Sequence, residues 1–149
     1  MTTPDTSQTD ASVLPALADF PFPTTLVVTG TVTGSPVTDI GVLHEAGDVD
    51  EIFPLASVTK PIVAWSALVA VDRGLLDLEA PAGPPAPDGA TIAHLLSHSS
   101  GIAVDSDERL AAPGTRRIYS NRGIEILGER LEEATGTPLE TWVETTVLE

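Results

Sequence analysis

The chain has 149 residues, of which 42% are hydrophobic, and this is enough for one domain with a sizeable core. Its formal net charge of −15 argues against nucleic acids and anionic membranes as partners, because both bind basic patches. The chain contains no cysteine, so disulfides and thiolate metal sites are excluded.

The beginning of the chain predicts a disordered tail over residues 1–20, since its first ten residues are mostly Thr, Ser, Asp and Pro. These residues lack the basic segment and apolar core of a signal peptide. No stretch has the roughly 18 consecutive apolar residues that a membrane span needs. We therefore expect a cytoplasmic protein with no membrane partner, whose folded domain covers residues 21–149.

Two strands are predicted next. Residues 25–33 are rich in β-branched side chains, which favour a strand. Residues 34–36, Gly-Ser-Pro, form a turn signal, and residues 37–45 predict a second strand. The turn is short, so we expect the two strands to be antiparallel.

A helix is predicted over residues 57–73, and it carries a hydroxyl and an amine at its start. Ser57 and Lys60 are spaced i, i+3, which places them on one helix face with a rise of about 4.5 Å between them. Pro61 is compatible with a first helical turn, and Gly74 is a plausible residue just after the helix end. The helix has almost no polar stripe, so we expect it to be buried on most sides.

Lys60 is the only lysine in the chain, whereas the other six basic residues are Arg. An arginine stays protonated and cannot act as a base, but a buried lysine can lose its proton. Ser57 and Lys60 are therefore a candidate pair of nucleophile and base. The alternative is that Ser57 caps the helix and Lys60 extends along its surface, because a Ser-x-x-Lys pattern alone is common.

The rest of the chain predicts short helices and turns. A Pro- and Gly-rich loop covers residues 80–89 and precedes a short helix over 91–96. A helix over 122–134 has an apolar stripe and stops at Gly136, and a last helix covers 139–148.

Two histidines and a tyrosine lie between these helices. His94 and His98 are spaced i, i+4, but no Glu lies between them as in the zinc-protease pattern, so we predict no metal site. We expect both to be structural and to hold a turn by side-chain hydrogen bonds. Taken alone, Tyr119 is interpreted as a half-buried tyrosine that precedes a helix, with Asn121 as the N-cap of that helix.

Three separated stretches together resemble one family. They are Ser57-Val-Thr-Lys60, then His94-Leu-Leu-Ser-His98-Ser-Ser-Gly101, then Pro113-Gly114 leading to Tyr119-Ser-Asn121. This order resembles the serine hydrolases related to class C β-lactamases, D,D-peptidases and β-lactamase-like esterases, over residues 25–149. A related Ser-x-x-Lys set occurs in class A β-lactamases and penicillin-binding proteins.

The resemblance implies an α/β (α+β) fold of the β-lactamase/transpeptidase type. An antiparallel sheet would pack on the Ser57 helix, with flanking helices and a small helical region that carries Tyr119. Ser57 would be the acylated nucleophile, and its backbone N–H would form one arm of the oxyanion hole. Lys60 and Tyr119 would handle the proton, with either as the base, and Asn121 would bind the substrate amide or carbonyl.

One part of the family pattern has no match. The family carries a Lys-Thr-Gly or His-x-Gly triplet on a late strand, and nothing after Asn121 resembles it. We therefore expect the C-terminal strands to be missing and the domain to be truncated.

The expected function is hydrolysis of a small ester or amide, including a β-lactam or a D-amino-acid peptide, through an acyl-serine intermediate and without a cofactor. Esterase or peptidase action is favoured over true β-lactamase action. The alternative is a catalytically incomplete fragment that only binds acyl ligands or a protein partner. The oligomeric state stays open.

Overall fold

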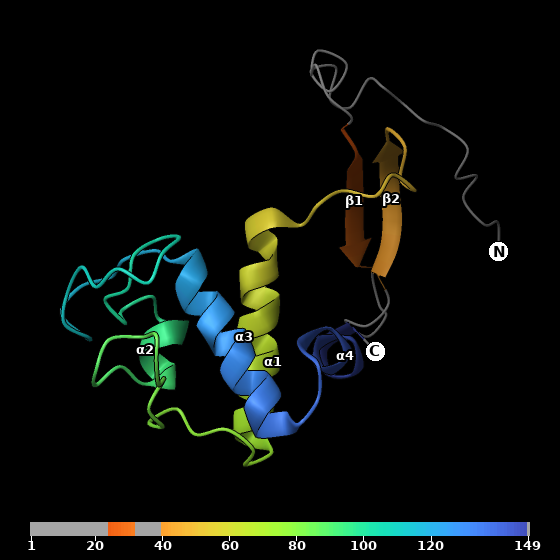
Figure 1. The fold of residues 1–149 in the computed structure, drawn as a ribbon. Coiled ribbons are helices and arrows are strands. Elements are labelled where there is room, and N and C mark those ends of the chain that lie inside the picture. The colour runs from red at the N-terminus through yellow and green to blue at the C-terminus, as the bar shows by residue number, and fades with distance from the viewer. Residues whose placement is uncertain (1–23, 32–39, 149) are drawn as a thin grey trace. The chain divides into compact units, whose positions relative to one another are not determined.

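The computed structural model describes residues 24–31 and 40–148, which form two compact units divided between Pro54 and Leu55 (Figure 1). The predicted tail over 1–20 and the predicted turn over 34–36 lie outside the described residues.

The first unit contains a β-hairpin. Strand β1, Leu26–Thr31, pairs antiparallel with strand β2, Ile40–Ala46, as the sequence predicts. Leu26 lies opposite Ala46 and Thr31 lies opposite Ile40, with one irregularity in the register between Val28 and Thr29. In the described residues 47–148 no further strand follows, and β pairing there is limited to two isolated bridges.

The turn after β2 depends on a glycine. Gly47 has a φ of 83°, and a Cβ at this position would lie 2.2 Å from the backbone oxygen of Thr24. A side chain is therefore excluded by both conformation and space. Nearby, the Thr25 hydroxyl donates to the backbone oxygen of Asp48 at 2.7 Å, which fastens the same turn to the start of β1.

The second unit begins with a 3-10 turn, Ala56–Val58, that runs directly into helix α1, Thr59–Asp72. Helical conformation therefore starts just before Ser57, as predicted, but the α-helix proper starts two residues after it. Arg73 ends α1, and Gly74 follows with a φ of 68°, in the left-handed conformation expected just after a helix end.

Within the second unit, α1 is buried along one face. Its buried residues Val63, Ser66, Ala67 and Ala70 follow the i, i+3, i+4, i+7 spacing of one helix face. Trp65 is 62% exposed. Within the second unit the other helices contact α1, and they bury this face. Burial of α1 on most sides stays a prediction, as does packing of the sheet on it.

Three further helices complete this unit: α2, Ile92–Leu96; α3, Asn121–Thr135; and α4, Leu139–Val143, which continues as a π-helical turn over Glu144–Leu148. Helix α3 lies alongside α1 and also contacts α2 and α4 (Figure 1). Gly136, with a φ of 66°, ends α3 as predicted. No helix in the described ranges has both the length and the apolar character to cross a bilayer.

The core of the second unit lies between α1, α2 and α3. The Trp142 indole of α4 packs into this core, and its N–H donates to the backbone oxygen of Ser66 on α1 at 3.0 Å. The buried hydrophobic residues of the core are Val63, Ala67, Ala70, Ala82, Ala86, Ala90, Ile92, Leu95, Ile102, Ile126, Leu127, Leu131 and Trp142.

Candidate active site

Ser57 and Lys60 are hydrogen-bonded at the start of α1. The Lys60 Nζ donates to the Ser57 Oγ at 3.1 Å, as the i, i+3 spacing predicts. The residue before the serine is strained, because Ala56 has a φ of 46°, in the left-handed region that costs a residue with a Cβ roughly 1–2 kcal/mol. This turn presents Ser57 at the surface of the unit, with the half-buried Lys60 beside it.

Tyr119 reaches the same hydroxyl from a distant part of the chain. Its phenol donates to the Ser57 Oγ at 2.7 Å, although the two residues are 62 positions apart. The Lys60 Nζ lies 4.9 Å from the centroid of the Tyr119 ring. The three side chains line a pocket of about 380 Å³, together with Pro61, Ala64, Leu96, His98 and Ile124.

The surroundings of Tyr119 make its phenol more acidic than that of a free tyrosine. Its neighbour Lys60 lowers its pKa most, and Ser57, whose hydroxyl can donate to the phenolate, lowers it further. Partial desolvation opposes these effects, while the positive charges of Lys60 and Arg117 add to them. An oxygen that titrates below the ordinary value of about 10 is better suited to exchange a proton with Ser57 near neutral pH.

Helix α3 starts directly after Tyr119, and Ser120 is its N-cap. The Ser120 Oγ accepts the backbone N–H of Gly123 at 2.8 Å and donates to the backbone oxygen of Ala103 at 2.6 Å. Ser120 has extended backbone angles, whereas Asn121 is already the first helical residue. The alternative that Asn121 caps this helix is therefore wrong.

The two histidines hold turns by side-chain hydrogen bonds, as predicted. The His94 Nδ1 accepts the backbone N–H of Thr91 at 3.1 Å, which caps α2. The His98 Nδ1 accepts the backbone N–H of Ser120 at 3.2 Å. Within residues 24–31 and 40–148 no group of three or more His, Asp or Glu side chains is placed to hold a metal ion.

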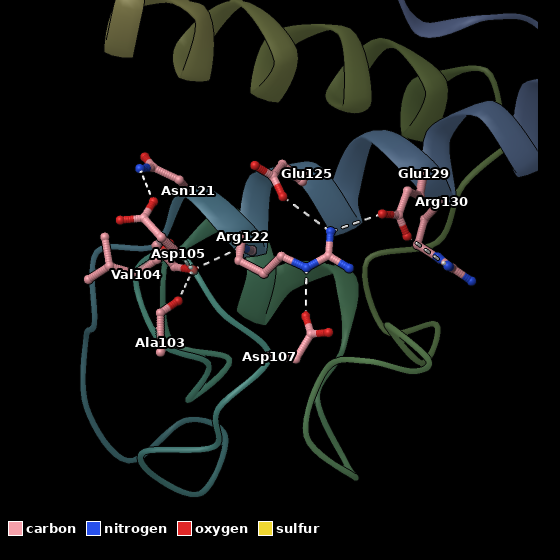
Figure 2. Close-up of polar contacts among 11 residues, drawn as sticks. Ala103, Val104, Asp105, Asp107, Asn121, Arg122, Glu125, Glu129 and Arg130 are labelled. Atoms are coloured by element: carbon pink, nitrogen blue, oxygen red, sulfur yellow. Dashed lines mark hydrogen bonds and ion pairs between the residues drawn. The ribbon is translucent and has the colours of Figure 1, made fainter.

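Asn121 makes its side-chain hydrogen bond away from the pocket that Ser57, Lys60 and Tyr119 line. Its Nδ2 donates to the Asp105 Oδ1 at 2.5 Å (Figure 2), and it is not among the residues that line the pocket. The structure thus brings Ser57, Lys60 and Tyr119 together and places the Asn121 amide against the loop over residues 104–110.

A second tie to this loop was not predicted from the sequence. The Arg122 Nε donates to Asp107 at 2.6 Å, and its NH1 nitrogen donates to Glu125 at 3.2 Å and to Glu129 at 3.0 Å (Figure 2). These carboxylates, Asp107 first, raise the pKa of the guanidinium. Glu125 and Glu129 follow Arg122 on α3 by three and seven positions, so only the pairing with Asp107 depends on tertiary structure.

The chain is similar to known proteins along most of its length. The profile of the Beta-lactamase family matches residues 24–149. Esterase EstB of Burkholderia gladioli is 35% identical, over 66% of this chain and 36% of the esterase. Penicillin-binding protein 4* of Bacillus subtilis is 28% identical, over 66% of this chain and 28% of that protein. The chain therefore matches about a third of the length of these curated relatives.

Solved structures agree with this likeness. A β-lactamase from Mycobacterium bovis superimposes with a TM-score of 0.76 and 40% identity, over 92% of this chain and 47% of that protein. An octameric penicillin-binding protein homologue from Pyrococcus abyssi superimposes with a TM-score of 0.71 over 93% of this chain and 41% of that one, and at 20% identity it supports the fold alone. The predicted β-lactamase/transpeptidase-like fold is thereby confirmed, whereas packing of the sheet on α1 stays a prediction.

Proposed function

The chain belongs to the β-lactamase family, and from this we propose that it is a serine hydrolase that cleaves an ester or an amide through an acyl-serine intermediate. One observation carries the proposal: the Ser57 Oγ is hydrogen-bonded by both the Lys60 Nζ, at 3.1 Å, and the Tyr119 phenol, at 2.7 Å. A serine hydroxyl is a weak nucleophile unless a base lies next to it, and here two candidate bases do.

In the proposed reaction the Ser57 Oγ bonds to the substrate carbonyl carbon, and its proton passes to Lys60 or Tyr119. The bond from that carbon to the leaving oxygen or nitrogen then breaks, and the leaving group takes a proton from the same pair. A water molecule next attacks the acyl-serine, gives one proton to the pair, and releases the acid. The pair returns a proton to the Ser57 Oγ, so no proton is gained or lost on the enzyme.

Two further groups are assigned to substrate binding. The backbone N–H of Ser57 is the proposed first arm of the oxyanion hole. Asn121 is the proposed contact for a substrate amide or carbonyl, and since one N–H of its amide is held by Asp105, the other N–H and the Oδ1 remain for the substrate. The proposed chemistry uses side chains and backbone groups alone, without a cofactor.

The proposed substrate is a small ester or amide, such as a β-lactam or a D-amino-acid peptide. Support comes from two relatives of the chain, an esterase and a penicillin-binding protein. The family match extends through both compact units, which supports our proposal that residues 21–149 belong to one domain.

Covalent labelling tests this function. The chain is incubated with a fluorophosphonate or a labelled penicillin, and the modified peptide is located by mass. We expect one label on Ser57, lost in Ser57→Ala and in Lys60→Ala. Ser97→Ala is the matched control, because Ser97 is exposed and its hydroxyl bonds to the backbone oxygen of Ala93. No label at any pH between about 6 and 10, a range that reaches the ordinary pKa of a tyrosine, would overturn the proposal in favour of a binding fragment.

A further inference from the structure

His98 contacts three consecutive residues around Tyr119. Its backbone oxygen accepts the N–H of Ile118 at 2.7 Å, and its Nδ1 accepts the N–H of Ser120 at 3.2 Å. Between these two bonds, the imidazole ring lies against the Tyr119 ring, with the centroids 4.9 Å apart and the planes tilted by 35°. One residue therefore restrains the backbone on both sides of Tyr119 and the ring itself.

His98 is itself rigidly placed. Its own N–H donates to the backbone oxygen of Leu95 at 3.1 Å, and the residue is only 9% exposed. Its φ of 56° is in the left-handed region, which residues with a Cβ rarely adopt and which is often retained at functional sites. The same ring lines the pocket that contains Ser57, Lys60 and Tyr119.

We propose that His98 is a positioning residue, whose neutral imidazole holds the Tyr119 phenol against Ser57 and Lys60. An effect of His98 on the rate of acyl transfer rests on the function proposed above. The placement of the Tyr119 phenol by His98 does not. His94 has no such role, because its Nδ1 is bonded to Thr91 at the start of α2.

The positioning role requires an unprotonated Nδ1, because only a lone pair accepts the Ser120 N–H. Burial lowers the pKa of His98, and the positive charges of Arg117 and Lys60 lower it further. The phenol of Tyr119 is a further titratable group against the ring. His98 is then neutral above its ordinary pKa of about 6.5, with its proton on Nε2. Its contribution to stability is complete above that pH and is lost as the pH falls through the lowered pKa.

A titration of Tyr119 tests the proposal, because Tyr119 is the only tyrosine in the chain and its absorbance reports this site alone. In His98→Ala we expect the midpoint of the phenol to rise toward the free value of about 10. In His98→Asn we expect a midpoint closer to that of the unmodified chain, because Asn tolerates a positive φ and offers an acceptor oxygen. The rate of Ser57 labelling should fall in His98→Ala, by up to about 100-fold.

His94→Ala is the matched control, and it should leave the Tyr119 midpoint unchanged while it weakens the cap of α2. A folded His98→Ala chain with an unchanged midpoint would overturn the proposal. If that variant does not fold, nitrogen NMR of the unmodified chain decides: a protonated Nδ1 on His98 at about pH 8 overturns the proposal, and a protonated Nε2 supports it. A chain that takes no label, but whose Tyr119 midpoint depends on His98, supports this inference while it overturns the proposed hydrolase.

Discussion

The starts of α1 and α3 supply the two halves of the site, and they are held in different ways. At the start of α1, one helical turn is enough to bond Lys60 to Ser57 at 3.1 Å. At the start of α3, Tyr119 is held by contacts with residues 17 or more positions earlier. Ile118 on one side bonds to His98, and Ser120 on the other side bonds to His98 and Ala103. The first half depends on spacing and the second on tertiary packing.

Substitutions in the two halves of the site should therefore have different effects. A change at the α1 half should alter the chemistry directly and leave the fold intact, since Ser57 is exposed and Lys60 is half-buried. A change in the support of the α3 half should act through stability and through the position of the phenol.

The largest effect is expected from Lys60→Met. Loss of the amine removes a proton acceptor next to Ser57, so labelling of Ser57 should slow by about 100- to 10,000-fold at unchanged melting temperature. Lys60→Arg is the matched control for charge: it keeps the cation but cannot act as a base, so labelling should also be lost. Rapid labelling in both variants would show that Lys60 takes no part in the reaction.

A core substitution should disturb the α3 half through the fold. Leu127 is fully buried on α3, and Leu127→Ala should lower the free energy of unfolding by about 2–5 kcal/mol, because it leaves a cavity. Leu148→Ala is the control, because Leu148 is 68% exposed and its loss should change the free energy of unfolding little. Urea denaturation measures both, and equal stabilities would refute the assignment of this core.

A smaller effect is expected at the cap of α3. Ser120→Ala removes the acceptor of the Gly123 N–H and should cost about 0.5–2 kcal/mol of stability. Tyr119 directly precedes this cap, so labelling should slow as well. Asn121→Ala should leave the cap intact, and a larger loss of stability in that variant than in Ser120→Ala would contradict the structure.

The smallest effect is expected in the Arg122 network. Asp107→Asn weakens a 2.6 Å ion pair whose arginine side chain is 22% exposed, and we expect a loss of at most about 1 kcal/mol. Asp88→Asn is the control, because Asp88 is 94% exposed in its pair with Arg109 and should contribute almost nothing. Thermal melts at low and high salt would measure both, and identical curves for the two variants would show that the tie to residues 104–110 adds no stability.

The same two halves explain how much the sequence predicted. The i, i+3 spacing was sufficient to place Lys60 next to Ser57, and Gly74 and Gly136 located the ends of α1 and α3. The link from Ser57 to Tyr119 came only from the order of three motifs, because no local rule joins residues 62 positions apart. The cap was assigned to Asn121 and not to Ser120, because Ser and Asn are both favourable N-cap residues and the sequence does not choose between neighbours. The Asp107–Arg122 pair was missed because Asp107 arrives through a loop whose path depends on packing.

An absorbance titration of the single tyrosine, in the unmodified chain and in Lys60→Met, tests most directly whether Ser57, Lys60 and Tyr119 form one proton-sharing cluster. We predict a Tyr119 midpoint below about 10 in the unmodified chain, because Lys60 and Ser57 lower the pKa of the phenol, and a rise toward 10 in Lys60→Met. The same midpoint near 10 in both folded proteins would contradict the account.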